Sequence, residues 1–245
     1  MKNEKETLNN EKTQTDIRGQ FEAGVIPPLN TIENIDCMEM LRKCPDKHFD
    51  LAIVDPPYGI GEGKRFRGMG TACMATDYGK KNWDASPPPR EYFEQLMRVS
   101  KNQIIFGANY FTEYLRPTMG WIFWDKEASG DFSDGELAWT SFERALRKYK
   151  YVWMGMRQGD MKNKEKRIHP TQKPVNLYRW LLKNYAKAGD LILDTHVGSG
   201  SSIIACIEGG FNYYGCEIDK DYYEAARRRI ARAFRKYELF ESEAV

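Results

Sequence analysis

The segment LILDTHVGSGSSIIACIEGGFNYYGCE, residues 191–217, decides the fold of this chain. Its apolar run Leu191–Asp194 predicts a buried strand, and Val197–Ser202 predicts a glycine-rich turn. A helix over Ile203–Glu208 and a second strand over Phe211–Glu217 are predicted to follow. A strand, a helix and a strand in this order form a βαβ unit, in which the two strands lie parallel.

The rest of the chain repeats this alternation. Asp50–Val54, Asn102–Phe106 and Trp121–Trp124 predict further short strands, and Pro87-Pro-Pro-Arg-Glu predicts the start of a helix. Asp219 is the predicted cap of a final helix. The pattern indicates an α/β fold with a mostly parallel sheet and helices on both faces.

The length of 245 residues is typical of one α/β domain. Residues 1–24 hold too few apolar side chains to compensate the entropy of ordering. They are therefore predicted to form a mobile N-terminal tail, before a single domain at 25–245. Residues 61–82 are rich in glycine, lysine and arginine, which predicts a long mobile loop.

The composition excludes several classes of protein. Hydrophobic residues make up 41%, and no apolar run approaches the roughly 18 residues of a membrane helix. The polar start of the chain argues against a secretory signal peptide and for a cytoplasmic location. The five cysteines form no CxxC pair and the three histidines stand apart, so neither a disulfide framework nor a metal site is expected. A formal net charge of +2 selects no partner.

The motif Asp55-Pro56-Pro57-Tyr58 directly follows the predicted strand 50–54. Its prolines stiffen the backbone, so the Asp55 carboxylate and the Pro56 carbonyl can face one point beside the Tyr58 ring. Two acceptors at one point suit an NH2 group, whose delocalised lone pair becomes available when both hydrogens are bound. The ring can stack on a flat base. The alternative is a structural turn followed by a core tyrosine.

The glycine turn is typical of a cofactor site. Gly198 and Gly200 let a ligand approach the backbone, and the next helix offers free N–H groups. Glu217 ends the following strand, where an acidic side chain can bind both ribose hydroxyls. A dinucleotide fingerprint would need a glycine in place of Ile203, so an adenosyl cofactor without a pyrophosphate fits better.

A third motif, His169-Pro-Thr-Gln-Lys-Pro174, precedes a predicted helix. Thr171 is the predicted N-cap, and Lys173 near the helix N-terminus predicts an anion site suited to a carboxylate. The alternative is a capped helix start with a surface lysine.

In this order the three motifs resemble the permuted beta group of S-adenosylmethionine-dependent DNA methyltransferases that modify exocyclic amines. The resemblance spans roughly residues 30–235 and implies a Rossmann-like methyltransferase fold with circularly permuted motif order. It also implies a seven-stranded, mostly parallel sheet with one antiparallel edge hairpin.

The resemblance implies a role for each matching residue. The catalytic set is Asp55, Pro56, Pro57 and Tyr58, and the cofactor set is Asp36, Cys37, Lys173, Asp194, His196, Gly198, Ser199, Gly200, Ser201, Glu217 and Ile218. Within the cofactor set, Lys173 is expected near the methionine carboxylate and Glu217 on the ribose. His196 departs from the family, which usually has a phenylalanine there, so its titration bears on cofactor affinity.

The implied activity is sequence-specific methyl transfer from S-adenosylmethionine to the amino group of a flipped adenine in duplex DNA, as in restriction–modification. Aspartate at the first motif position usually accompanies adenine in this family. The alternatives are cytosine N4, RNA, a protein amide, or a DNA-binding module without catalysis. A homodimer and a companion restriction endonuclease are left open.

DNA recognition is expected in residues 126–168, with help from the loop 61–82. Between Arg144 and Arg167 nine basic residues face two acidic ones. The predicted DNA-binding residues are Arg144, Lys148, Lys162, Lys164, Lys166 and Arg167. The alternative is a solvated basic face over a core strand, which could be Tyr149-Lys-Tyr-Val-Trp153. The rival basic set Arg227, Arg228, Arg229, Arg232 and Arg235 is predicted to be solvated on the final helix.

Overall fold

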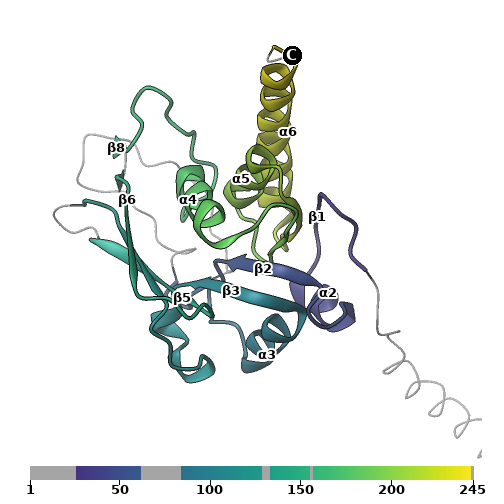
Figure 1. Cartoon of the computed structure of the whole chain (residues 1–245), viewed down its shortest axis with the longest axis vertical. Helices are drawn as coiled ribbons and strands as arrows, with labels where there is room; N and C mark the ends of the chain where they lie inside the picture. Colours follow the sequence, from purple (N-terminus) through teal and green to yellow (C-terminus); the bar gives the residue numbers. More distant parts are fainter. Residues whose placement is uncertain (1–25, 62–83, 129–132, 155–156, 244–245) are drawn as a thin grey trace, which may run out of the picture.

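A computed structural model describes residues 26–61, 84–128, 133–154 and 157–243, and the predicted tail and residues 62–82 of the predicted loop lie outside these ranges. In the described residues an eight-stranded sheet has the order β1-β10-β9-β2-β3-β5-β4-β6, and β7 and β8 pair separately (Figure 1). The strands are β1 Thr31–Glu33, β2 Phe49–Val54, β3 Ser100–Phe106, β4 Trp121–Asp125, β5 Gly135–Thr140, β6 Arg147–Lys150, β7 Trp153–Met154, β8 Arg157–Gln158, β9 Leu191–Asp194 and β10 Asn212–Cys216. The α-helices are α2 Cys37–Lys43, α3 Arg90–Val99, α4 Val175–Tyr185, α5 Ser201–Gly209 and α6 Lys220–Glu243.

The predicted βαβ unit is β9–α5–β10. Strands β9 and β10 are parallel neighbours, with Leu193 opposite Tyr214. Helix α5 ends at Gly210, whose φ of 68° lies in the left-handed region that glycine adopts without strain. Asp219 caps α6 as predicted, because its side chain accepts hydrogen bonds from the N–H groups of Asp221 and Tyr222.

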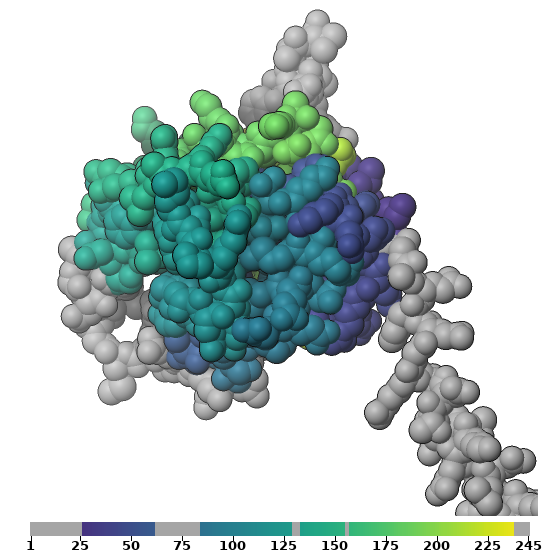
Figure 2. Space-filling view, turned by 60° about the horizontal axis from the view of Figure 1, so that its bottom comes forward, coloured from purple at the N-terminus to yellow at the C-terminus, as the bar shows by residue number. Residues whose placement is uncertain are grey.

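Both faces of the sheet are buried, as predicted from the continuous apolar run of β2. Ala52 and Val54 pack into the core beneath α2 and α3, whereas Leu51 and Ile53 pack into the core beneath α4 and α5. Figure 1 shows α4, α5 and α6 on one side of the sheet and α2 and α3 on the other. Figure 2 shows α2 and α3 as one continuous surface. In the described part of the chain no helix is long and apolar enough to cross a membrane.

The antiparallel part of the sheet differs from the expectation. Strand β5 pairs antiparallel with both β3 and β4, as a hairpin inside the sheet rather than at its edge. An eighth strand, β6, lies outside the hairpin and is parallel to β4, with Arg147 opposite Ile122. Exposed ion pairs of Lys148 with Asp125 and of Lys150 with Glu127 line this edge. The seven-strand expectation is wrong because Arg147–Lys150 adds a charged strand to the edge, where lysine is common.

Candidate functional site

Two strand ends define the site. Strands β2 and β9 are parallel neighbours, with Ala52 opposite Leu193, so their carboxyl ends lie at the same edge of the sheet. Asp55 directly follows β2, and Asp194 is the last residue of β9. Pro56 is buried and Pro57 is half-buried at this edge. The fold thus places the start of the proline motif beside the start of the glycine turn, Val197–Gly200.

Tyr58 contributes a hydroxyl as well as a ring. Its hydroxyl donates a hydrogen bond of 2.7 Å to Asp55 Oδ1, and burial raises the pKa of Tyr58 well above its ordinary value, so the proton stays in place. The ring stacks on that of Tyr110, which is exposed, at a centroid distance of 5.2 Å. Gly107, with a φ of 64°, makes room for this ring, because a Cβ there would lie 2.1 Å from Tyr58 Cε1. The sequence motif indicated neither the hydrogen bond nor the contact with Tyr110.

Lys173 reaches the Asp55 carboxylate. Its Nζ lies 2.5 Å from Asp55 Oδ2, 3.0 Å from Glu136 Oε2 and 3.2 Å from the Tyr58 hydroxyl, and its side chain is 4% exposed. Sequence reasoning missed Glu136, the second residue of β5. The ammonium of Lys173 therefore has two carboxylate partners within the protein, where the sequence predicted a site for a ligand anion.

The N-terminus of α4 is capped differently from the prediction. The helix begins after Pro174, and the first helical N–H, that of Val175, donates to Glu165 Oε1 at 2.9 Å. Thr171 is not the N-cap, because it lies three residues before the cap position at Pro174 and its hydroxyl is hydrogen-bonded to Nδ1 of His169 at 3.1 Å. The cap comes from a carboxylate ten residues upstream, which no local sequence signal reveals.

The two carboxylates on Lys173 differ in acidity. Burial raises the pKa of Asp55, and the Lys173 ammonium offsets this only in part. Burial also acts on Glu136, but the ammonium groups of Lys173 and Lys126 outweigh it and lower the pKa of Glu136 to about 2. The two ammonium groups therefore favour the charged form of Glu136, and Asp55 is the carboxylate of this pair whose pKa is raised.

Asp194 organises the chain between β9 and α5. Its Oδ1 accepts a hydrogen bond of 3.0 Å from the His196 N–H, and its Oδ2 accepts one from the Ser202 hydroxyl. Burial raises the pKa of Asp194 to about 7. Burial also lowers the pKa of His196 to about 4, so this departure from the family carries no charge near neutral pH. The His196 ring packs edge-on against Tyr92 in the core.

The glycine turn and Glu217 meet as predicted. Gly198 and Gly200 have φ values of 52° and 78°, in the region that favours glycine. The Gly198 N–H donates to Glu217 Oε2 at 2.8 Å, and the Asp219 N–H donates to Oε1 at 2.9 Å. Two backbone donors thus fix the Glu217 carboxylate beside the turn.

The segment before α2 joins this end of the site. Asp36 caps α2 by accepting a hydrogen bond from the Met38 N–H, and Cys37 is buried as the first residue of the helix. The side chain of Asn34 donates to the carbonyls of Glu217 and Ile218, at 2.7 and 3.1 Å. The structure therefore brings Asp36 and Cys37 to Glu217 and the exposed Ile218, which are about 180 residues away in the chain.

The prediction for the final helix is wrong at Arg229. It was predicted to be solvated, but its side chain is 15% exposed. Its Nη1 donates to the Ser199 carbonyl and to the Ser201 hydroxyl, and its Nη2 lies 2.5 Å from Glu165 Oε2. Arg229 thus links α6, the glycine turn and the segment before α4. On a helix with five arginines, no sequence signal distinguishes it from the others.

The predicted DNA-binding residues between Arg144 and Arg167 fall into two groups, those with partners within the protein and those exposed on a loop. Arg144 donates to the Asn184 carbonyl, Lys148 pairs with Asp125, and Arg167 lies over the Trp153 ring at 4.6 Å. The side chains of Lys162, Lys164 and Lys166 are exposed on the loop between β8 and α4. Among the aromatic residues of the segment, Trp153 is buried and Tyr149 packs on Trp180, so both serve the core.

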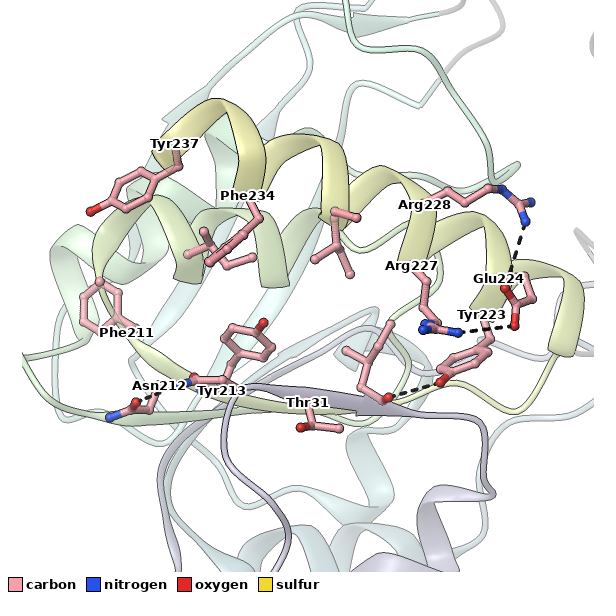
Figure 3. A pocket seen from close by; sticks show the side chains of 16 residues that line it. Thr31, Phe211, Asn212, Tyr213, Tyr223, Glu224, Arg227, Arg228, Phe234 and Tyr237 are labelled. Carbon is pink, nitrogen blue, oxygen red and sulfur yellow. Dashed lines mark hydrogen bonds and ion pairs between the residues drawn. The ribbon is translucent and has the colours of Figure 1, made fainter. Parts of the chain in front are cut away.

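A groove of about 1050 Å³ lies apart from these residues, between α6 and the edge formed by β1 and β10. Figure 3 shows Tyr213 of β10 and Tyr223 and Phe234 of α6 around it. None of its lining residues belongs to the predicted catalytic or cofactor sets.

Comparison with known proteins gives concordant results. A family model described as DNA methylase matches residues 121–228. The Type II methyltransferase M2.DpnII of Streptococcus pneumoniae is 33% identical over 248 residues, which cover 80% of this chain and 87% of the relative. The solved M1.HpyAVI–SAM complex matches with a TM-score of 0.51 at 21% identity, covering 81% of this chain and 98% of that one. The cytosine-N4-specific PvuII DNA methyltransferase has a TM-score of 0.53 at 11% identity, over 84% and 92% of the chains, and shares the fold.

The Tyr58 hydroxyl provides a first prediction. Tyr58→Phe retains the ring but removes the hydrogen bond that fixes the orientation of the Asp55 carboxylate, so any reaction that depends on that orientation should slow about tenfold to a hundredfold. Tyr58→Ala should slow it further, because the stacking surface is lost as well. Turnover of Tyr58→Phe equal to that of wild type would show that the ring alone matters.

Arg229 provides a second prediction. Arg229→Gln leaves Glu165 without its arginine, so the free energy of unfolding in urea should fall by about 3 kcal/mol. The matched control Arg227→Gln removes an exposed side chain that pairs with Glu224 at 3.7 Å and lies over the Tyr223 ring at 5.7 Å, and should change stability by less than about 0.5 kcal/mol. Equal effects of the two substitutions would contradict the buried position of Arg229.

Proposed function

Because this chain belongs to the family of DNA methylases that act on exocyclic amines, we propose that it methylates the amino group of a flipped adenine within a specific duplex sequence. The family and the α/β methyltransferase fold predicted from the motifs are confirmed. The methyl donor is S-adenosylmethionine, the cofactor of this family. The choice of adenine, the site residues and the recognition segment are our proposals.

One observation carries the proposal. The Asp55 carboxylate and the glycine turn lie at the ends of adjacent parallel strands, and Lys173 contacts both. Its Nζ binds Asp55, while its carbonyl accepts a hydrogen bond of 2.7 Å from the Ser201 hydroxyl at the start of α5. An acceptor for an amine and a turn for an adenosyl group therefore belong to one continuous site.

The residues around the turn fit the cofactor. A Cβ at Gly198 would lie 3.8 Å from the His169 ring, an ordinary contact, so it is the positive φ that favours glycine at this position. Each oxygen of Glu217 accepts one backbone N–H, which leaves lone pairs free for two ribose hydroxyls. Asp36, Cys37 and the exposed Ile218 form the side of the site expected to meet the adenine. When bound, the cofactor supplies an electrophilic methyl group on its sulfonium.

The proline motif prepares the amine. Asp55 accepts one hydrogen of the target NH2 and the Pro56 carbonyl accepts the other, which makes the nitrogen more tetrahedral and its lone pair available. Tyr58 and the neighbouring exposed Tyr110 offer ring surface for a base that has left the duplex. No covalent intermediate is expected, because the cysteines of the described residues are all buried and burial raises the pKa of Cys37 to about 12.

The choice of adenine rests on the aspartate at the first motif position, which in this family usually accompanies adenine. The same acceptor pair would bind the N4 amine of cytosine, so cytosine is the second candidate base. We assign duplex recognition to residues 126–168, because Lys162, Lys164 and Lys166 are exposed on the loop between β8 and α4.

Methyl transfer is the test of this function. Wild-type protein incubated with methyl-labelled S-adenosylmethionine and duplex DNA should yield labelled N6-methyladenine after digestion to nucleosides. Asp55→Ala should lose the transfer but keep cofactor binding in calorimetry, whereas Glu217→Ala should weaken cofactor binding more than the transfer step. Label in N4-methylcytosine would select the second base, and label only in RNA or protein would reject the DNA assignment. Unchanged cofactor affinity in Glu217→Ala would remove Glu217 from the site.

The recognition segment provides a separate prediction. Each neutralised phosphate lowers log K by roughly 0.9 per decade of salt. Replacing Lys162, Lys164 and Lys166 together with glutamine should therefore flatten the salt dependence of duplex binding by up to about 3 units, with cofactor affinity unchanged. The control replaces the exposed Arg227, Arg228 and Arg232 of α6 and should leave the slope as it is. An unchanged slope in the lysine variant, with a flatter slope in the arginine variant, would instead place the DNA on α6.

A further inference from the structure

A carboxylate outside the three sequence motifs lies in the amine-binding site. Glu136 belongs to β5, and each of its oxygens meets a different ammonium group. Lys126 Nζ lies 2.5 Å from Oε1, and Lys173 Nζ lies 3.0 Å from Oε2. The Tyr58 hydroxyl is 3.4 Å from the same Oε2. Glu136 therefore touches two of the groups that bind Asp55.

The buried ammonium group of Lys173 needs negative partners. The Lys173 ammonium is buried between the rings of Phe106 and Tyr58, at 4.8 and 5.6 Å from their centroids, where an unpaired charge would be costly. Asp55 alone would neutralise it completely. The second carboxylate shares the ammonium, and Lys126 in turn balances the second carboxylate. Two carboxylates and two ammonium groups thus form a neutral cluster.

We propose that Glu136 is a positioning residue for methyl transfer: anchored by Lys126, it shares the Lys173 ammonium with Asp55, so that Asp55 keeps more of its charge and stays a strong acceptor for the target amine. This inference rests on the proposed function. Without the charge of Glu136, the ammonium would belong to Asp55 alone. The Asp55 oxygens would then accept less strongly from the amine, because more of their charge would be neutralised.

The same geometry predicts a change in pH dependence. The Asp55 carboxylate must be ionised to accept the amine, so the rate falls as the pH drops through the pKa of Asp55. The negative charge of Glu136 raises the pKa of Asp55, and its removal should move the acid limb of the rate profile to lower pH. Several other charged or titratable groups face the pair Asp55 and Glu136. They are Tyr58 after β2, Lys126 after β4, Lys173 before α4, Tyr178 in α4 and Asp194 in β9.

The experiment is a pH series of single-turnover methyl transfer from S-adenosylmethionine to duplex DNA. Glu136→Gln should lower the rate at neutral pH by about tenfold to a hundredfold, with affinities for both substrates within about twofold of wild type. The acid limb of the pH–rate profile of Glu136→Gln should lie at lower pH than that of wild type. Lys126→Gln should also slow transfer, whereas Lys126→Arg, which keeps the charge, should retain most of the rate. The matched control is Glu91→Gln, which removes an exposed carboxylate paired with Arg42 and should behave as wild type.

Each outcome separates the alternatives. If Glu136→Gln has the rate and the acid limb of wild type, Glu136 has no positioning role. A slower Glu136→Gln with a lower melting temperature and an unmoved acid limb would show a purely structural role and reject the proposal. If Glu136→Gln does not fold, the comparison of Lys126→Arg with Lys126→Gln takes its place. Equal rates of methyl transfer in these two variants would overturn the proposed role of Glu136. A wild-type chain without methyl transfer would reject the proposed function itself and this role with it.

Discussion

One buried ammonium group joins the parts of the site that come from distant segments of the chain. Lys173 Nζ binds Asp55 after β2 and Glu136 in β5, and the Lys173 carbonyl binds the Ser201 hydroxyl at the start of α5. A buried charge that lost these partners would cost several kcal/mol. The relative position of the proline motif and the glycine turn therefore depends on this residue, which comes from the third motif.

The two halves of the site are stabilised by different forces. The amine half is a cluster of charges, in which Asp55 and Glu136 share Lys173. The cofactor half relies on backbone N–H groups, two of which fix the Glu217 carboxylate. Arg229 supports that half from outside, through the Ser199 carbonyl. In the proposed reaction, the charged half meets a nitrogen whose charge changes during methyl transfer.

The sequence predicted what local signals encode. The βαβ unit, the strand before Asp55 and the cap at Asp219 follow from short patterns of apolar, glycine and capping residues, and the structure contains all three. Contacts between distant segments escaped prediction. The strand considered as an alternative at 149–153 overlaps β6 only at Tyr149 and Lys150. Glu136 and Arg229 resemble ordinary surface residues until the fold brings them to Lys173 and Ser199. Thr171 was assigned as a cap because the actual cap, Glu165, acts only through the folded loop.

The most direct test of the central claim is a crystal structure with an unreactive cofactor analogue and a duplex that the protein methylates. We expect a flipped adenine whose exocyclic nitrogen lies about 3 Å from the Asp55 carboxylate and the Pro56 carbonyl. The cofactor analogue should lie across the glycine turn beside Glu217. A target base that remains stacked in the duplex, or an amine that points away from Asp55, would contradict the account.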